Sequence, residues 1–323
     1  MAVTEVPFEA ATVGYVERSP KANRRRRRRF PWYAYLALAP LMVVLGWFAY
    51  YPAASGIFFS FFDWNPASVS EFIGLENYAT MLDDKIWWKS FGNLGIIFLF
   101  GIASWIFPLL AAELLITLRS ARAQYVFRTL LIIPMAFPGV VTALVWSFMY
   151  QPNNGLINTT LENLGLGFLA SNWVGDPDTA LLALLFIGFP WIAGLPFLLI
   201  YTSLQNVPPE IFEAAEIDGV GRIRRFWTID LPLMATQAKI LVFLAVVSTL
   251  QYGFMAFIVT GGGPDNATMV PVLRMLNVAF QGGDWGYAAA LSTTLFFITL
   301  FFSVIIVFFR RKKTESTSDA KGM

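Results

Sequence analysis

The sequence contains no cysteine and no histidine among its 323 residues. It therefore has no disulfide, no thiolate nucleophile, no imidazole base and no Cys/His zinc site. Charged residues are also scarce, at 14% of the chain against roughly 25% in soluble domains. These absences exclude most hydrolases and metalloenzymes, and they argue against a single water-soluble fold.

Hydrophobic residues make up 57% of the chain, and phenylalanine (31) and tryptophan (11) are abundant. A helix needs about 20 mainly apolar residues to cross a bilayer, and we find six such runs. We therefore predict an all-α integral membrane protein with six transmembrane helices. The predicted helices cover residues 33–58, 93–116, 129–150, 179–202, 240–259 and 287–309.

The loops between these runs differ in charge. The first, third and fifth loops carry three basic residues, Lys85, Lys89 and Arg274, against ten acidic ones, and the other basic residues lie on the tails and the remaining loops. The positive-inside rule then places both termini in the cytoplasm. We expect a multi-pass protein of the cell membrane, that is, the inner or plasma membrane.

Six arginines at positions 24–29 precede the first run. We interpret them as the charge that keeps the N-terminus in the cytoplasm. A patch for nucleic acid or anionic lipid is the alternative, and of these partners we expect membrane lipid and no nucleic acid.

Acidic side chains are nearly absent from the predicted spans. Glu113 is the exception, and we interpret it as an interfacial carboxylate with a cation, Arg119, nearby in the sequence. Intramembrane acids usually carry proton or cation coupling. Their scarcity argues against an ion-coupled carrier or channel, whose uptake would follow an ion gradient and ignore ATP.

Several uncharged residues in or near the spans suit a neutral polyhydroxylated ligand, which is held by aromatic faces and by amide or hydroxyl hydrogen bonds. Each also has a structural explanation, because aromatic residues anchor helices at the membrane surface and amides bond across helices. The substrate-pathway candidates are Asn93, Trp146, Tyr150, Gln151, Trp191, Gln251 and Tyr252.

The fourth loop, residues 207–232, has the pattern of a helical hairpin. Pro208 and Pro209 suit a helix start, residues 210–217 are good helix formers, and Gly219 suits the left-handed turn that ends a helix. So short a hairpin cannot bury its own core, so we expect it to dock into a partner. An amphipathic connector at the membrane surface is the alternative.

This loop resembles the EAA motif of binding-protein-dependent ABC importer permeases. The family pattern is Glu-Ala-Ala, then Asp-Gly-Ala, then Phe, Ile and Leu-Pro at set distances, and Val220 replaces the last alanine here. The residues that match in register are Glu213, Ala214, Ala215, Asp218, Gly219, Phe226, Ile229, Leu231 and Pro232.

Four further segments resemble the sugar-importing, maltose-type branch of that family, and they occur in the same order. They are Gly-Leu-Glu-Asn-Tyr at 74–78, Phe-Arg-Thr-Leu at 127–130 with Pro134, Pro138 and Trp146, Gly-Leu-Ile-Asn at 155–158, and Thr-Gly-Gly-Gly-Pro at 260–264 with Asn266 and Thr268.

The resemblance implies the type I ABC importer fold and a partner for each task that this chain does not perform. A second permease subunit would complete the pathway, a cytoplasmic ATPase dimer would use ATP and Mg²⁺, and an extracytoplasmic binding protein would deliver the solute. We expect this chain to catalyse no reaction and to bind no metal or cofactor. The residues implied as ATPase contacts or turn-setters are Glu213, Ala214, Ala215, Asp218 and Gly219.

The resemblance also implies a carbohydrate solute, with a glycerol phosphate ester as the alternative. No arginine or lysine inside a predicted span is available to hold a phosphate. The predicted parts are a basic cytoplasmic tail (1–32), the first transmembrane helix and outer loop (33–88), a core transmembrane domain (89–309) with the coupling loop (207–232), and a cytoplasmic C-terminal tail (310–323).

A membrane enzyme, such as a glycosyl or lipid transferase, is the remaining class. It would need clustered acids or a metal site, and the only dense acids lie in the EAA-like loop, whose register explains them better. The glycines at 261–263 are not followed by the Lys-Ser/Thr of a P-loop, so a partner must handle nucleotide.

Overall fold

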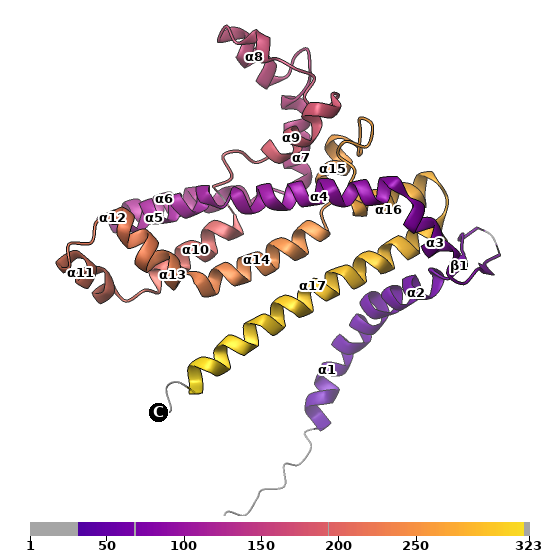
Figure 1. The fold of residues 1–323 in the computed structure, drawn as a ribbon, viewed down its shortest axis with the longest axis horizontal. Helices are drawn as coiled ribbons and strands as arrows, with labels where there is room; N and C mark the ends of the chain where they lie inside the picture. The colour runs from indigo at the N-terminus through magenta and orange to yellow at the C-terminus, as the bar shows by residue number, and fades with distance from the viewer. Residues whose placement is uncertain (1–31, 68, 193, 320–323) are drawn as a thin grey trace, which may run out of the picture. The chain divides into compact units, whose positions relative to one another are not determined.

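The computed structural model describes residues 32–67, 69–192 and 194–319. The arginine run and nearly all of the predicted N-terminal tail lie outside the described residues. Two compact units divide the chain, with the boundary between Tyr51 and Pro52. The described residues of both units are mainly helical, as the long apolar runs predict (Figure 1).

The first half of the chain forms helices, two short strands and single helical turns. In order, these elements are α1 (Trp32–Leu45), η1 (Gly46–Tyr50), α2 (Tyr51–Phe59), β1 (Phe62–Asp63), β2 (Glu71–Phe72), α3 (Glu76–Asp83), α4 (Lys85–Ala103), α5 (Ile106–Ile116), α6 (Ala121–Ile132), η2 (Ile133–Ala136), α7 (Gly139–Met149), α8 (Leu156–Asn163) and η3 (Gly167–Leu169).

The second half is helical throughout its described elements. In order, these are α9 (Pro177–Phe186), α10 (Leu195–Gln205), α11 (Pro209–Ile217), α12 (Arg222–Arg225), η4 (Phe226–Asp230), α13 (Leu231–Leu233), α14 (Ala235–Leu250), α15 (Phe254–Val259), α16 (Pro271–Leu276), η5 (Asn277–Gln281) and α17 (Trp285–Asp319). The last helix continues past residue 309, where we predicted the sixth span to end.

Three helical runs are long and apolar enough to cross a membrane: Tyr35–Phe59, Lys85–Ile116 and Trp285–Ile306. They correspond to the first, second and sixth predicted spans. The third predicted span is a bent pair, α6–η2 with α7 at 88°. A second bent pair, Ile223–Leu233 with Gln237–Leu250 at 69°, overlaps only the first part of the fifth predicted span (240–259), whose last residues form the separate helix α15. Counting each pair as one span gives five. The fourth predicted span is present as two shorter apolar helices, α9 and α10.

The bends have local chemical causes. Proline lacks the N–H that a helix needs and restricts the residue before it, and Pro134 and Pro138 lie at the break between α6 and α7. Between α9 and α10, Gly188, Trp191 and Gly194 all have positive φ angles. Helical hydrogen bonding cannot continue through such residues, so one apolar run forms two helices.

A small antiparallel sheet follows α2, in which β1 pairs with β2 and Phe62 lies opposite Phe72. The side-chain amide of Asn77 donates to the carbonyls of Ser60 and Phe62, each at 3.0 Å, and ties α3 to this sheet. Our all-α prediction missed the sheet, because two-residue strands leave no alternating pattern to detect.

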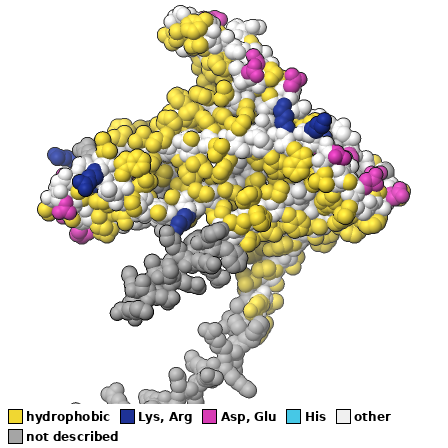
Figure 2. Space-filling view, viewed as in Figure 1, with side chains coloured by type: hydrophobic (Ala, Val, Ile, Leu, Met, Phe, Trp, Pro, Cys, Tyr) yellow, Lys and Arg dark blue, Asp and Glu magenta, His cyan; other side chains and the backbone are white. Residues whose placement is uncertain are grey.

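Two apolar clusters hold the second unit together. The first surrounds Trp87 and Leu291 and joins α4, α9, α16 and α17, and the second surrounds Phe197 and Tyr201 and joins α5, α10 and α14. Outside these clusters many large apolar side chains are exposed. Hydrophobic side chains cover most of the face drawn in Figure 2, while charged ones mostly gather toward its ends. Such a surface suits lipid.

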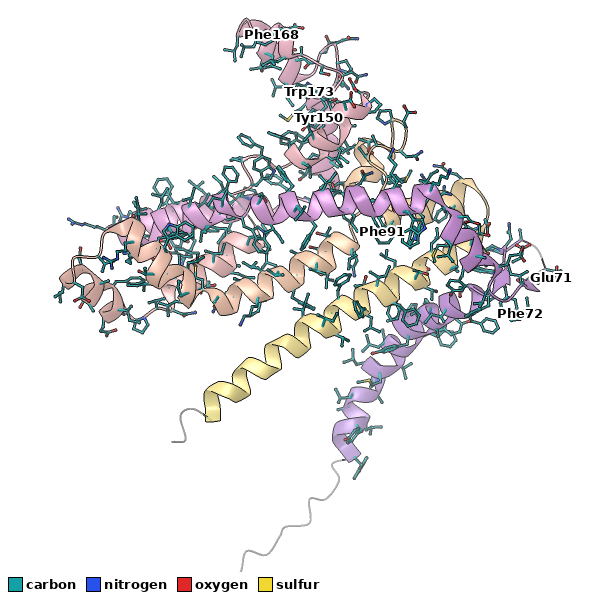
Figure 3. The ribbon with its side chains drawn as sticks, viewed as in Figure 1. Glu71, Phe72, Phe91, Tyr150, Phe168 and Trp173 are labelled. Carbon is teal, nitrogen blue, oxygen red and sulfur yellow. The ribbon has the colours of Figure 1, made fainter. Side chains whose placement is uncertain are left out.

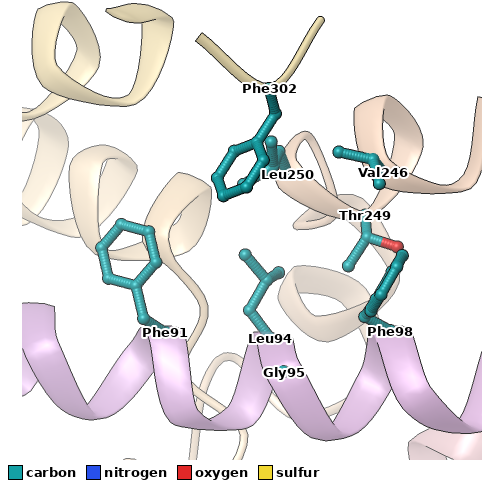
Figure 4. A pocket seen from close by; sticks show the side chains of 8 residues that line it. All are labelled: Phe91, Leu94, Gly95, Phe98, Val246, Thr249, Leu250 and Phe302. Carbon is teal, nitrogen blue, oxygen red and sulfur yellow. The ribbon is translucent and has the colours of Figure 1, made fainter. Parts of the chain in front are cut away.

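A cavity of about 230 Å³ lies between α4, α14 and α17 (Figure 4). Thr249 supplies the only polar side chain among the residues that line it, and none of the substrate-pathway candidates is among them. A polar solute would find almost no hydrogen-bonding partner there. The lining residues are Phe91, Leu94, Gly95, Phe98, Val246, Thr249, Leu250 and Phe302.

Candidate functional site

The predicted hairpin is present, and α11 and α12 lie together at one end of the second unit, while α3 lies at the other (Figure 1). Pro208 and Pro209 occupy the N-cap and first helical positions of α11, where a missing N–H removes no helical bond. Gly219 ends the helix with a φ of +68°. The amide of Val220 donates to the carbonyl of Ala215 at 2.9 Å, which completes a Schellman cap. The predicted glycine turn is confirmed.

The five predicted ATPase-contacting residues divide between two faces of the hairpin. Ala215 is only 4% exposed, so its small side chain lies on the inward face. Glu213, Ala214, Asp218 and Gly219 are exposed. The hairpin therefore leaves two carboxylates and the turn accessible.

An ion-paired cluster lies at the root of this hairpin, which we define as the end of α12 and the following turn η4. Nε of Arg225 donates to Oδ2 of Asp230 at 3.0 Å, and a terminal nitrogen of Arg225 lies 3.6 Å from Oε2 of Glu113 on α5. The side chain of Asp230 is fully buried. The cation beside Glu113 is thus Arg225 and not Arg119, because α5 ends at Ile116 and Arg119 lies exposed beyond it.

The sequence pattern did not reveal this cluster, because the two charged residues of the loop are spaced unusually. Arg225 and Asp230 lie five positions apart, whereas α-helical ion pairs are three or four apart. Residues 226–230 form a π-helical turn, which brings positions five apart onto one face. The sequence signal for this pair is a pair of opposite charges five positions apart.

Two substrate-pathway candidates, Asn93 and Tyr150, have side chains that bond to backbone carbonyls far away in the sequence. The amide of Asn93 donates to the carbonyl of Met269 at 2.9 Å, and the hydroxyl of Tyr150 donates to the carbonyl of Ala183 at 2.8 Å. Tyr150 is 2% exposed. Both residues join distant segments. For Asn93 this is the structural role that we weighed against solute binding, whereas for Tyr150 we had weighed an anchor at the membrane surface instead.

Trp191 lies at the break between α9 and α10, inside a group of aromatic rings. Its indole N–H donates to the carbonyl of Leu185 at 3.1 Å. Four phenylalanine rings surround it, with centroids 5.0 to 5.3 Å from its own. They belong to α4, α5, α9 and the break itself: Phe100, Phe107, Phe186 and Phe189.

Among the described residues, no contact brings the other four candidates together. Trp146 is half-buried, with its ring centroid 5.5 Å from that of Tyr150. Gln151 and Gln251 are exposed at the ends of α7 and α14, and Tyr252 packs against the first apolar cluster. Figure 3 shows Tyr150 near α7 and Phe168 at the far end of the segment that carries α8.

A second charged cluster joins α4, α16 and α17. Oδ2 of Asp84 accepts from Nε of Arg274 at 3.0 Å and from the hydroxyl of Tyr287 at 2.8 Å, while its other oxygen caps α4 through the amide of Trp87. Burial raises the pKa of Asp84, but the bonds from Trp87, Tyr287 and Arg274 outweigh it, so the pKa lies below its ordinary value. No sequence pattern marks this cluster, because Arg274 and Tyr287 lie 190 and 203 positions from Asp84 along the chain.

The profile of the family described as binding-protein-dependent transport system inner membrane component matches residues 104–314, which is more than half of the chain. The chain belongs to this family. The matched region contains the α11–α12 hairpin, the Glu113–Arg225–Asp230 cluster, and Trp191 with three of its four phenylalanine neighbours, Phe100 lying just before it. The protein is therefore a permease of a binding-protein-dependent ABC importer, a non-catalytic, multi-pass component of the inner membrane.

Relatives of this permease match 80–85% of its length. It is 35% identical to YurN, a probable ABC transporter permease protein of Bacillus subtilis, over 80% of this chain and 89% of that one. It is 30% identical to the diacetylchitobiose uptake permease NgcF of Streptomyces coelicolor, over 85% and 82%. It is 31% identical to the sn-glycerol-3-phosphate permease UgpA of Shigella flexneri, over 82% and 89%.

The fold of this permease is also that of a solved transporter. A chain of a bacterial alginate ABC transporter, solved in complex with an alginate pentasaccharide-bound periplasmic protein, superposes with a TM-score of 0.74 at 18% identity. The match covers 88% of this permease and 95% of that chain.

Proposed function

We propose that this permease forms half of the pathway of an ATP-driven carbohydrate importer and that its α11–α12 hairpin docks into a separate ATPase. The observation that supports this most is the hairpin itself. Its cap at Gly219 holds the turn, Ala215 faces inward, and Glu213 and Asp218 stay exposed. A protruding hairpin of this kind is suited to a groove on a partner, and ATP and Mg²⁺ would be used there.

In the bilayer we propose six crossings with both termini in the cytoplasm. The three long helices and the bent pair of α6–η2 with α7 supply four crossings. We assign the fourth crossing along the chain to α9 with α10 and the fifth to α14, which leaves α11 and α12 outside the bilayer. A broken crossing is tolerated where the freed backbone groups face protein or water. This arrangement places the hairpin on the cytoplasmic side, where an ATPase operates.

The proposed solute is a mono- or oligosaccharide, supported by the uncharged character of the pathway candidates. Gln151 and Gln251 expose amides at the ends of apolar helices, and an amide facing lipid is unfavourable. We therefore infer that both face water or a second permease subunit. Among the relatives, NgcF is named for diacetylchitobiose uptake and UgpA for sn-glycerol-3-phosphate transport, so both solute classes enter the test.

The proposed mechanism is alternating access. ATP would draw the two ATPase subunits together, and with them the hairpins of the two permease subunits. The helices joined to each hairpin would then rock as rigid bodies and open the pathway outward. An extracytoplasmic binding protein would deliver the solute, and hydrolysis would return the pathway to the inward-open state.

Two experiments test this function. A thermal-shift panel of mono- and disaccharides and sn-glycerol 3-phosphate on the cognate binding protein should show stabilisation by a sugar. Stabilisation by the phosphate ester alone would contradict the carbohydrate assignment. Uptake of the stabilising compound into vesicles should then require internal ATP, and uptake driven by an ion gradient without ATP would contradict the coupling.

Docking of the ATPase is tested by its retention on an affinity-tagged permease. Glu213→Ala should reduce the retained ATPase severalfold, because it removes an exposed carboxylate from the docking face. Glu216→Ala, which also changes an exposed glutamate of α11, is the matched control and should retain the ATPase. Equal retention by both variants would place docking elsewhere.

A further inference from the structure

A single guanidinium at the root of the hairpin contacts three separate elements. Besides its contacts with Glu113 on α5 and Asp230 on η4, Arg225 lies over the ring of Phe212 on α11, with its central carbon 4.9 Å from the ring centroid. A cation at this distance from an aromatic face is attracted to it. Arg225 therefore touches both arms of the hairpin and a helix that lies more than a hundred positions earlier in the sequence.

The cluster has little access to solvent. The side chains of Arg225 and Glu113 are 19% and 14% exposed, and that of Asp230 is not exposed. Oε1 of Glu113 and Oδ1 of Asp230 have no hydrogen-bond partner within the described residues. One cation thus serves two largely buried carboxylates, and separating the hairpin from α5 would leave a buried charge unpaired, which is strongly unfavourable.

We propose that Arg225 is a positioning residue that locks the hairpin to α5. The inference rests on the proposed function, in which the hairpin receives the motion of an ATPase. The chain connects the hairpin directly to α10 and α14 but not to α5, so motion reaches α5 only through non-covalent contacts. Arg225 supplies a buried contact of this kind, which makes the hairpin and α5 move as one body.

Distances between two spin labels test this rigidity. The chain has no cysteine, so cysteines introduced at Leu114 on α5 and Glu210 on α11, both exposed, carry unique labels once the partner subunits are cysteine-free. The distance between the two labels is measured by pulsed electron–electron double resonance on the assembled complex. It is recorded in the nucleotide-free state and after trapping with Mg·ATP and vanadate. With Arg225 present, one narrow distance distribution should persist in both states.

Arg225→Met should broaden the distance distribution at least about twofold in the trapped state. It removes both the positive charge and the planar guanidinium group, with its several N–H donors. Arg224→Met, an exposed neighbour on the same helix, is the matched control and should leave it unchanged. The double variant Glu113→Gln/Arg225→Met should be no broader than Arg225→Met alone, since both substitutions remove the same link. Superimposable distributions for Arg225→Met and the native chain would overturn the proposal.

Glu113→Gln keeps the test valid if Arg225→Met does not fold. It leaves the Arg225–Asp230 pair intact and removes only the ionic link to α5, so it should also broaden the distribution. Arg225→Lys keeps the positive charge but lacks the planar guanidinium group. Its distance distribution should therefore have a width between those of the native chain and Arg225→Met. A native width for Glu113→Gln would overturn the proposal.

Retention of the ATPase on the same samples separates this inference from the proposed function. Arg225→Met should retain the ATPase, because it leaves the docking face in place, while Glu213→Ala should lose it. If Glu213→Ala retains the ATPase, docking at the hairpin fails, and the label distances still decide whether Arg225 holds the hairpin to α5.

Discussion

Asn93 on α4 donates its side-chain amide to the backbone carbonyl of Met269 at 2.9 Å, across 176 positions of the sequence. The loop between α15 and α16 that ends near Met269 holds the Thr-Gly-Gly-Gly-Pro segment. Inside it, the hydroxyls of Thr260 and Thr268 lie 2.7 Å apart. One turn before Asn93, Lys89 donates to the carbonyl of Asp265 at 3.1 Å. The loop is therefore an internally bonded turn that α4 holds in place.

Replacing Asn93 with alanine should destabilise the permease, because it removes the donor from the buried carbonyl of Met269. An unsatisfied buried group costs about 1–3 kcal/mol, so the unfolding temperature of the purified protein should fall by several degrees. Lys89→Ala removes an exposed bond and should have a smaller effect. Normal stability of Asn93→Ala combined with loss of uptake would instead identify Asn93 as a solute contact.

The Asp84 carboxylate predicts an acid-sensitive stability. Its pKa is lowered in the folded protein from an ordinary value of 3.8, so the unfolded state binds the proton more tightly. The stabilisation is complete above the unfolded value and is lost as the pH falls through the lower, folded one. The unfolding temperature should therefore drop as the pH falls below about 4.

Asp84→Asn should lower the unfolding temperature at neutral pH and flatten its decline below about pH 4, because the titrating group is gone. The matched control is Asp83→Asn, which changes the exposed neighbour and should leave both features as in the native chain. A native pH profile in Asp84→Asn would show that another group causes the acid sensitivity.

Gly219 and Gly221 form a matched pair for testing the hairpin turn. A β-carbon added at either position meets no heavy atom within 4 Å, but Gly219 alone has a left-handed φ. Gly219→Ala should therefore strain the backbone by about 1 kcal/mol and reduce retention of the ATPase, whereas Gly221→Ala should not. Equal retention would mean that docking tolerates a distorted turn.

Local residue chemistry predicted those elements that depend on neighbours in the sequence. The prolines and Gly219 located α11 to within a residue or two, and apolar length located the first, second and sixth spans. The division of the predicted span 179–202 into two separate helices was missed, because the average hydropathy of a segment does not reveal a change in backbone direction. The link from Arg225 to Glu113 was also missed, because it depends on how α5 packs beside the hairpin, which no single segment encodes.

Trp191 gives a final test of structural against solute-binding roles. Trp191→Phe keeps a ring among the four phenylalanines but removes the N–H that bonds to the carbonyl of Leu185, and it should cost about 1 kcal/mol. Trp191→Ala also removes the ring packing and should cost more, roughly 2–4 kcal/mol for a partly buried site. Unfolding temperatures check both, with uptake of the compound that stabilises the binding protein measured alongside. A stacked sugar needs the indole face more than its N–H. A loss of uptake in Trp191→Ala that exceeds its loss of stability would therefore identify Trp191 as a solute contact. If uptake and stability fall in proportion, Trp191 instead holds the break between α9 and α10.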